Sequence, residues 1–364
     1  MQSLFKQLTI ERSLVILTAI LVLLILIEMN YFTSGVLGAI TLYVVCRNFY
    51  FHLVEKKRWN KILAITLIIF LIIVCFGVPI WLILEILIPQ INGLIQNPEA
   101  IVQRFQPVID YIQTHEWVRN LDIKISNEQI FSIINKALSY IHSTLSWVGQ
   151  LLANVLVALF ILYFMLLGGR KMENKLWSFM PFSEVSKAFF VRQNLELIRS
   201  NAYGIPILAV SQGVIAIIGY MIFGIEQGVF WGLLTGIASV LPVVGTMVVW
   251  IPICIYQIAT GQVQEGLMLS LYCFVLVGGI DNVLRFTILK RMADIHPLIT
   301  VFGVLLGLQL FGVMGLVFGP LLLSLPIIFY QVYEIERHGN KPVGVGDTAN
   351  PEESNLIGTK ELQK

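Results

Sequence analysis

Two long apolar segments of this chain are interrupted near their middle in the same way. The first spans residues 230–257 and the second spans residues 302–331. In each, two glycines four positions apart precede a Pro/Gly or Gly/Gly break, and the apolar run after the break closes with Pro-Ile-x-x-Tyr-Gln. Each segment exceeds the roughly 20 residues of one untilted membrane crossing and is broken where a continuous helix would suffer most. Paired interruptions of this kind are typical of the binding site of a membrane transporter.

The composition of the chain indicates a membrane protein. Of its 364 residues, 57% are apolar and only 13% are charged, about half the charged fraction of an average soluble domain. The apolar runs are rich in Leu and Ile and do not alternate with a period of two, which excludes a β-barrel. Several exceed the roughly 20 residues needed to cross a bilayer as a helix. The runs are 13–34, 35–46, 62–88, 147–167, 202–223, 230–258, 266–284 and 298–330.

Clusters of basic residues mark the loops expected on the cytoplasmic side. Five lie in residues 47–61, six in residues 170–199 and three in residues 285–291, whereas the turns around Glu226 and Glu265 hold no Lys or Arg. If both interrupted segments crossed as single helices, the basic loop 285–291 would lie outside. The charges fit if each segment is a re-entrant hairpin that returns to the side from which it started.

We therefore expect an all-α polytopic membrane protein with about six full transmembrane helices and two opposed re-entrant hairpins in an inverted helix-plus-hairpin repeat. The hairpin tips should face each other, because non-helical backbone at membrane depth must be shielded from lipid. The predicted parts are transmembrane helices 1–3 in 1–88, an extracytoplasmic amphipathic helical region in 89–146, transmembrane helix 4 and a basic cytoplasmic loop in 147–201, a transport core in 202–335 with repeats 202–258 and 266–331, and a disordered cytoplasmic tail in 336–364.

Ionisable residues inside a membrane are functional hypotheses by default. Asp281 is followed by Asn282, and Arg285 lies one helical turn further on. This carboxylate either binds a proton, a cation or a polar solute, with Arg285 modulating its charge, or forms an ion pair that anchors a helix end. His296 precedes Pro297 at the mouth of the second interrupted segment, where it either shuttles protons or marks a helix start.

Uncharged polar residues in and before the interrupted segments are candidates to line a binding site. Interrupted helices free backbone N–H and C=O groups, which can coordinate a polar solute or a sodium ion. Glycine and proline at the breaks would form the hairpin tips, although small residues also serve helix–helix packing. The candidate lining residues are Ser211, Gln212, Thr235, Ser239 and Gln309, and the candidate tip residues are Pro242, Gly245, Gly312, Gly315, Gly319 and Pro320.

Several enzyme classes lack their motif in this sequence. It contains no Walker-type glycine loop and no His-Glu-x-x-His, and Asp281 has no intramembrane aspartate partner of the kind an aspartyl protease needs. The four cysteines fall inside apolar runs without ligand spacing, so we interpret them as small buried hydrophobic residues. We expect no enzymatic activity, no metal, no cofactor and no nucleic-acid partner.

The chain resembles the AI-2E family of bacterial transporters over nearly its whole length, up to about residue 335. The resemblance rests on the break Leu241-Pro242-Val243-Val244-Gly245, on Asp281-Asn282, on His296-Pro297 followed by Phe302-Gly303, and on the run GVMGLVFGP at 312–320. One departure is Phe286, where the family commonly has a proline. The resemblance implies a multi-pass, homo-oligomeric protein of the bacterial plasma (inner) membrane.

From the residues and this resemblance we expect a secondary exporter that moves a small polar solute, such as the autoinducer-2 signal, by alternating access. Its partners would be the lipid bilayer, a small-molecule or cation substrate and further copies of the chain, and both termini would be cytoplasmic. One alternative is a sodium- or lithium/proton antiporter that uses Asp281. An alternative of another class is a channel or structural membrane oligomer.

Overall fold

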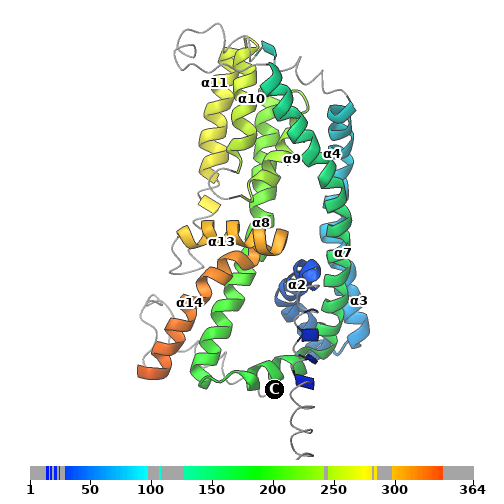
Figure 1. The fold of residues 1–364 in the computed structure, drawn as a ribbon, viewed down its shortest axis with the longest axis vertical. Coiled ribbons are helices and arrows are strands. Elements are labelled where there is room, and N and C mark those ends of the chain that lie inside the picture. Colours follow the sequence, from blue (N-terminus) through cyan, green and yellow to red (C-terminus); the bar gives the residue numbers. More distant parts are fainter. Residues whose placement is uncertain are drawn as a thin grey trace, which may run out of the picture.

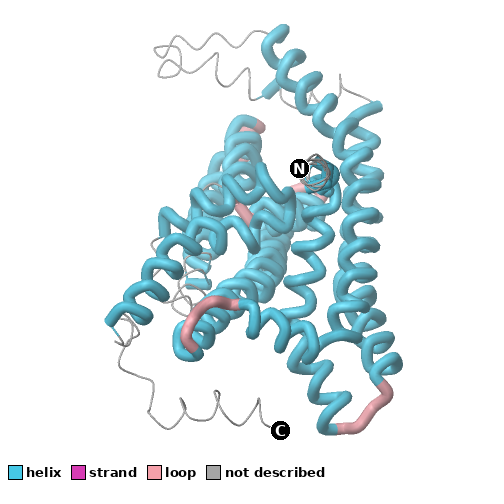
Figure 2. Tube along the Cα trace, turned by 60° about the horizontal axis from the view of Figure 1, so that its bottom comes forward, coloured by secondary structure: helices cyan, strands magenta, loops and turns pink. Residues whose placement is uncertain are grey.

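The computed structural model describes residues 14–15, 17–18, 20–22, 24, 29–96, 106–107, 127–241, 245–280, 283–284 and 297–338, and all regular structure in them is helical (Figures 1 and 2). The α-helices are α2 (Thr33–Phe51), α3 (Lys61–Ile72), α4 (Val78–Gln96), α7 (Asn127–Phe179), α8 (Glu184–Ile222), α9 (Gly228–Ala238), α10 (Met247–Ala259), α11 (Val263–Tyr272), α13 (Pro297–Phe311) and α14 (Gly315–His338). Short π-helical turns are η2 (His52–Lys56), η3 (Ile73–Gly77) and η4 (Cys273–Val277), and 3-10 turns are η1 (Met29–Phe32) and η5 (Gly312–Met314).

Six stretches of the described residues are long and apolar enough to cross a membrane, which confirms the expected all-α polytopic fold. They are Thr33–Lys56, Lys61–Pro89, Gly149–Phe179, Glu184–Ile222, Val263–Ile280 and Leu298–Arg337. The last of these turns at Gly312, so it consists of the two helices α13 and α14. The predicted first span, 13–34, is described only in part, since residues 13, 16, 19, 23 and 25–28 lie outside the described residues.

Helices α2, α3 and α7 pack together in the amino-terminal half. Tyr43 of α2, Ile65 of α3 and Leu162 of α7 belong to one buried apolar cluster. Gly35 lets α2 approach α7 closely, because a Cβ atom there would lie 2.9 Å from the carbonyl oxygen of Asn154. The Gly35 N–H also donates to Asn154 Oδ1 at 2.9 Å. These contacts make α2 and α7 one scaffold, along which α3 and α4 lie in Figure 1.

The basic stretch 170–199, which the sequence indicated as a loop, is largely helical. α7 continues to Phe179 and α8 begins at Glu184, so only residues 180–183 join them. The 53 residues of α7 measure about 80 Å, which far exceeds the hydrocarbon thickness of a bilayer. The basic residues therefore lie where the helices extend beyond their apolar part. Some form ion pairs along α8, such as Lys187 with Glu184.

The first interrupted segment forms a helical hairpin, the first hairpin, made of α9, residues 239–246 and α10. Gly228, the first residue of α9, lies against Tyr220 of α8, where an added Cβ would lie 3.1 Å from the Tyr220 Cβ. Near the end of α10, Gln257 Nε2 donates to the carbonyl oxygen of Phe223 at 2.9 Å. Helix α9 thus runs back along α8, and α10 returns to the carboxyl end of α8.

The second interrupted segment also folds back on itself, as the second hairpin, made of α13, η5 and α14. A Cβ added at Gly303 would lie 2.7 Å from the Pro320 Cα, and one added at Gly307 would lie 2.7 Å from the Gly319 Cα. Gly312 makes the turn with a φ of +58°, in the left-handed region that favours glycine. Helix α13 therefore packs antiparallel against the first half of α14.

The two hairpins approach α8 from opposite ends. At the amino end of α8, the Ser183 N–H donates to Glu336 Oε1 at 2.6 Å, which places the end of α14 there. Asn201 Nδ2 of α8 donates to the carbonyl oxygen of Val317, near the start of α14, at 3.1 Å. Coming from the other end, Gly236 of α9 packs against the Ala209 carbonyl. The placement of both hairpins in a bilayer as re-entrant segments stays a prediction.

Candidate functional site

Helix α8 is the element that both hairpins share. Its buried residues recur every three or four positions, so they lie on one side of the helix. Leu197 packs with Val317 and Phe318 of the second hairpin, whereas Ala216 and Tyr220 belong to a buried cluster with α10 and α11. The first hairpin reaches α8 as far as Ala209, so the stretch between the two contact regions runs from Gly204 to Leu208. The buried residues of α8 that make this side are Leu197, Asn201, Gly204, Leu208, Gln212, Ala216 and Tyr220.

Proline lies in the middle of this stretch. Pro206 is inside α8 and has no N–H group, so the Ala202 carbonyl lacks its usual intrahelical donor. A helix that is continuous in the structure therefore has a weak point between the two hairpin contacts. Freed carbonyl groups of this kind can accept a hydrogen bond from a polar solute.

The first hairpin contacts α8 through backbone rather than through side chains. A Cβ atom added at Gly236 would lie 2.6 Å from the Ala209 carbonyl oxygen and 3.0 Å from the Gly213 Cα, and one added at Gly232 would lie 2.8 Å from the Ile217 N. Any larger residue at Gly232 or Gly236 would push α9 away from α8. The glycine pair four positions apart in the first segment thus serves helix–helix packing.

Gln212 is the predicted lining residue with unused hydrogen-bonding groups. Its side chain is fully buried, with 0% exposure. Neither its Nε2 nor its Oε1 has a hydrogen-bond partner in the part of the chain that the structure describes. A carboxamide offers two donors and an acceptor with two lone pairs, and an unsatisfied buried polar group costs about 1–3 kcal/mol. An unpaired buried amide of this kind calls for a bound partner.

Three of the other predicted lining residues, Thr235, Ser239 and Ser211, donate to a backbone carbonyl three or four positions earlier in the chain. Thr235 Oγ1 donates to the Trp231 carbonyl at 2.8 Å, so it accepts from the Tyr220 hydroxyl 2.9 Å away. Ser239 donates to the Gly236 carbonyl at 2.7 Å, and both Thr235 and Ser239 are buried. Ser211 is half-buried and donates to the Ile207 carbonyl at 2.7 Å. Gln309 is exposed on α13. The structure thus brings Gln212, Thr235 and Ser239 into the packed region of α8 and α9.

The predicted tip residues differ in position. Gly245 is buried, and a Cβ there would collide with the Ala238 carbonyl, so the first turn requires glycine. Gly312 makes the second turn and Gly315 opens α14. Gly319 and Pro320 lie inside α14 rather than at the turn, in the contact with α13. The reason is that Gly312, with its left-handed φ, makes the turn earlier, so that α14 begins at Gly315 and Pro320 lies in its second turn.

Five predicted residues lie outside the described part of the chain and stay predictions. They are Pro242 at the first tip, the pair Asp281 and Asn282, and the two charge modulators Arg285 and His296. Asp281 follows directly in sequence after Ile280, which ends the apolar stretch that begins at Val263.

Sequence reasoning missed Asn201 and Tyr220. Asn201 is only 8% exposed and joins α8 to the second hairpin, and Tyr220 is fully buried and joins α8 to the first. Both lie on the buried side of α8 that also carries Gln212, Asn201 about three helical turns before it and Tyr220 about two turns after it. The sequence analysis assigns Asn201 to the basic loop. Continuing the three- and four-residue spacing of the helix at 202–223 towards lower residue numbers would include Asn201 on the same side.

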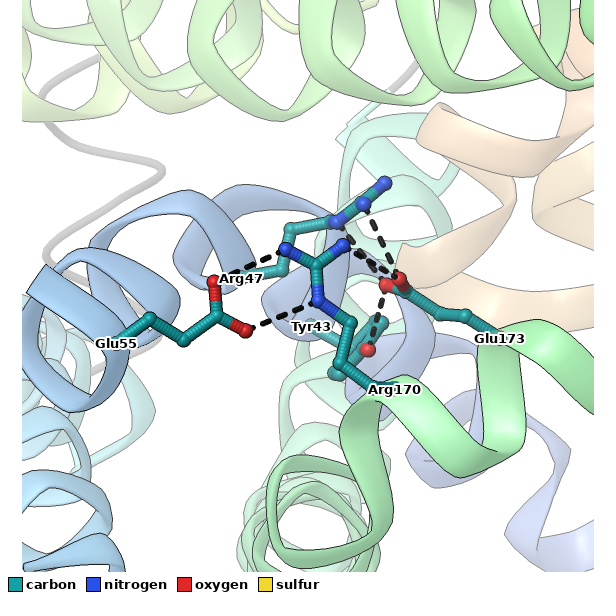
Figure 3. Close-up of polar contacts among 5 residues, drawn as sticks. All are labelled: Tyr43, Arg47, Glu55, Arg170 and Glu173. Carbon is teal, nitrogen blue, oxygen red and sulfur yellow. Dashed lines mark hydrogen bonds and ion pairs between the residues drawn. The ribbon is translucent and has the colours of Figure 1, made fainter. Parts of the chain in front are cut away.

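A second polar cluster joins α2 to α7 at the basic end of the scaffold (Figure 3). Glu173 accepts from the Tyr43 hydroxyl at 2.7 Å and pairs with Arg47 at 3.1 Å. Arg170 holds Glu55 through two hydrogen bonds of 3.0 and 3.1 Å. Two arginines and two glutamates thus neutralise each other, so this cluster fastens helices together rather than presenting a charge to a ligand.

Comparison with known proteins places the sequence beside a family of transporters. The model of a family described as AI-2E family transporter matches residues 14–335. A protein of Aquifex aeolicus is 26% identical over 302 residues, which cover 77% of this chain and 84% of the relative. A protein of Methanocaldococcus jannaschii is 28% identical over 76% of this chain and 83% of its own length. A Mycobacterium tuberculosis protein is 23% identical over 92% of both chains. All three carry the name "Putative transport protein".

Proposed function

The chain belongs to the AI-2E transporter family and is a multi-pass membrane transporter, and we propose that it exports a small polar solute such as autoinducer-2 by alternating access around α8. The choice of autoinducer-2 follows from the resemblance to this family, which is also called the autoinducer-2 exporter family. The packing of two hairpins on α8 from opposite ends supports a site that opens to either side in turn.

The observation that carries this proposal is the unpaired amide of Gln212. It is fully buried on α8, between Ala209 and Gly213, which both contact Gly236 of the first hairpin. A neutral amide can donate to and accept from hydroxyl groups without holding a fixed charge. A small hydroxylated solute that is nearly neutral, as autoinducer-2 is, would satisfy it.

In the proposed cycle each hairpin closes the site toward one side of the membrane. The first hairpin covers α8 from Ala209 to Tyr220, and the second covers it from Leu197 to Asn201. Separation of the first hairpin from α8 would expose Gln212 and residues 204–208 to one side, and separation of the second would expose residues 204–208 to the opposite side. The weak point at Pro206 lets α8 adjust between these two states.

The test is uptake of labelled autoinducer-2 into inverted vesicles that contain wild type or Gln212→Leu. We expect the variant to lose at least about tenfold in uptake, the equivalent of one lost hydrogen bond of about 1.4 kcal/mol. Because leucine removes an unsatisfied buried amide, we also expect its unfolding free energy to rise by about 1 kcal/mol. Val214→Leu, on the exposed side of α8, is the control and should change neither quantity. A Gln212→Leu variant that is less stable and transports normally would refute the role of Gln212.

Two further flux measurements distinguish the proposed function from its alternatives. Antiport predicts sodium- or lithium-stimulated proton release from vesicles that disappears in Asp281→Asn, and autoinducer-2 export predicts uptake without a sodium requirement. A channel or structural oligomer predicts neither coupled proton release nor concentrative uptake. Export without a sodium requirement supports the proposal, and each of the other results contradicts it.

A further inference from the structure

The turn between α2 and α3 carries an excess of positive charge that the structure leaves without partners. Lys56, Lys57, Arg58 and Lys61 are all exposed, and no ion pair joins any of them to an acidic residue in the described part of the chain. Four cations within six residues are unusual in a chain whose net charge is only +2. We call residues 56–61 the basic corner.

The one acidic residue beside the basic corner already has a partner. Glu55 binds Arg170 of α7 through two hydrogen bonds, as Figure 3 shows. Arg47, less than three helical turns earlier, is likewise paired with Glu173. The neighbouring cluster therefore balances its own charges, and the corner beside it does not. This contrast indicates that the corner cations are directed at something outside the protein.

The backbone of the basic corner is ordered by several hydrogen bonds. The Lys57 N–H donates to the His52 carbonyl, and the Trp59 N–H donates to the Leu53 carbonyl, both at 3.1 Å. Asn60 caps α3 by accepting the Ile62 N–H at 3.1 Å. Arg58 has a φ of +54°, a left-handed conformation that is uncommon for a residue with a side chain. The cations are thus held on a defined turn, which lowers the entropy that a ligand must overcome.

Apolar side chains lie directly next to these cations. Trp59 is 44% exposed, and Ile62 and Leu63, in the first turn of α3, are more than half exposed. The corner also joins the candidate spans Thr33–Lys56 and Lys61–Pro89, so it lies where both reach the membrane surface. Tryptophan and long basic side chains prefer this interface, where an apolar part meets lipid tails and a charge meets headgroups.

From these observations we propose that the basic corner is a binding site for the headgroup of an anionic phospholipid, with the acyl chains lying along Trp59, Ile62 and Leu63. The phosphate would be held by Lys56, Lys57, Arg58 and Lys61. Because Glu55 of the same π-helical turn is bonded to α7, a lipid bound here would also stabilise the contact between α2 and α7.

The experiment measures lipid retention and thermal stability of the purified full-length chain with added phosphatidylglycerol, phosphatidylcholine or inorganic phosphate. The test variant is Lys56→Gln/Lys57→Gln/Arg58→Gly/Lys61→Gln, in which glycine suits the left-handed backbone. The matched control is Lys171→Gln/Lys175→Gln, which removes two exposed cations of α7.

We expect wild type and control to retain phosphatidylglycerol and to gain in melting temperature with it, and the test variant to do neither. Each cation near an anionic surface contributes roughly a fivefold gain in affinity, so the four together should change it by about 100-fold or more. The effect should shrink as salt rises above 0.1 M, where charges about 10 Å apart are screened. Equal retention by the test variant, equal stabilisation by phosphatidylcholine or by phosphate alone, or loss of binding in the control would overturn the proposal.

Discussion

The two hairpins share a sequence pattern, but the glycines of that pattern contact a different helix in each. In the first, Gly232 and Gly236 of α9 pack against α8, the helix that precedes the hairpin. In the second, the matching Gly303 and Gly307 of α13 pack against α14, which follows the turn. The same two glycines four positions apart thus join a hairpin to its support in one case and close the hairpin on itself in the other.

This difference indicates how each hairpin is attached. The first hairpin is built into the helices around it, since Trp250 and Ile253 of α10 share a buried cluster with α8 and α11. The second hairpin is closed by its own glycines. It is held to its surroundings by an apolar patch and by single hydrogen bonds, such as the Ser34 hydroxyl donating to the Phe311 carbonyl at 2.5 Å. We infer that the second hairpin can separate from α8 and α2 as a unit more readily than the first.

The largest expected effect comes from adding one methyl group to each glycine contact. Gly236→Ala and Gly307→Ala each place a Cβ against backbone atoms that cannot rotate away, so each should lower the unfolding free energy by about 1–3 kcal/mol. Gly168→Ala, in α7, is the control: nothing lies within 4 Å of its added Cβ, and alanine should stabilise the helix by about 0.5–1 kcal/mol. Thermal unfolding in detergent measures all three.

A double-mutant cycle sharpens the same comparison. Because Gly236 contacts Gly213 directly, the variants Gly236→Ala and Gly213→Ala should interact by more than about 0.5 kcal/mol. Gly236→Ala and Gly307→Ala lie in separate hairpins and should add within about 0.5 kcal/mol. Strong coupling between the two hairpins would break the distinction between them.

Substituting the glutamine that ends each interrupted segment should change the unfolding free energy by a smaller amount. Gln257 is 2% exposed and donates to the Phe223 carbonyl, whereas Gln331 is half-buried on α14. We expect Gln257→Ala to cost about 1.5 kcal/mol by removing a buried hydrogen bond, and Gln331→Ala to cost less than about 0.5 kcal/mol. Chemical denaturation of the two variants side by side measures this, and equal costs would mean that the repeat ends are equivalent after all.

The smallest expected effect concerns how the second hairpin is held. Ser34→Ala and Asn201→Ala each remove one hydrogen bond to it, worth about 1 kcal/mol or less in stability. Both should raise amide hydrogen exchange in α13 and α14 and leave exchange in α9 and α10 unchanged. Tyr220→Phe, which removes the bond to Thr235, is the matched control and should affect α9 alone. Faster exchange in both hairpins from Ser34→Ala would contradict the inference.

The sequence predicted the membrane character and the helical class because these depend on local composition. An apolar run long enough to cross the bilayer indicates by itself that it lies in lipid, so the spans can be located without knowing which other segments they contact. The ends of the helices could not be located in the same way. The charges in residues 184–201 predict a loop, yet these residues form the first half of α8. Charge marks where a helix leaves the apolar layer, and the helix itself continues wherever its backbone bonds are satisfied.

The sequence context of three predicted lining residues accounts for their burial but not for their hydrogen bonds. Gln212, Thr235 and Ser239 were chosen because polar groups in apolar segments are costly, and all three are buried. Sequence reasoning could not tell that Thr235 bonds to Tyr220 of α8, or that Gln212 has no partner among the described residues, because both depend on how α9 lies on α8.

The amino-acid sequence by itself determined that this chain resides in a membrane as helices, that two of its segments are interrupted, and which family it belongs to. Those properties follow from residue type and spacing along the chain. Only the tertiary structure decided which helix each glycine pair contacts, and that Gln212 of α8 has no hydrogen-bond partner within the part of the chain that is described. The physical reason is that glycine permits close approach without choosing a partner. The choice depends on which surfaces the turns at Gly245 and Gly312 bring together.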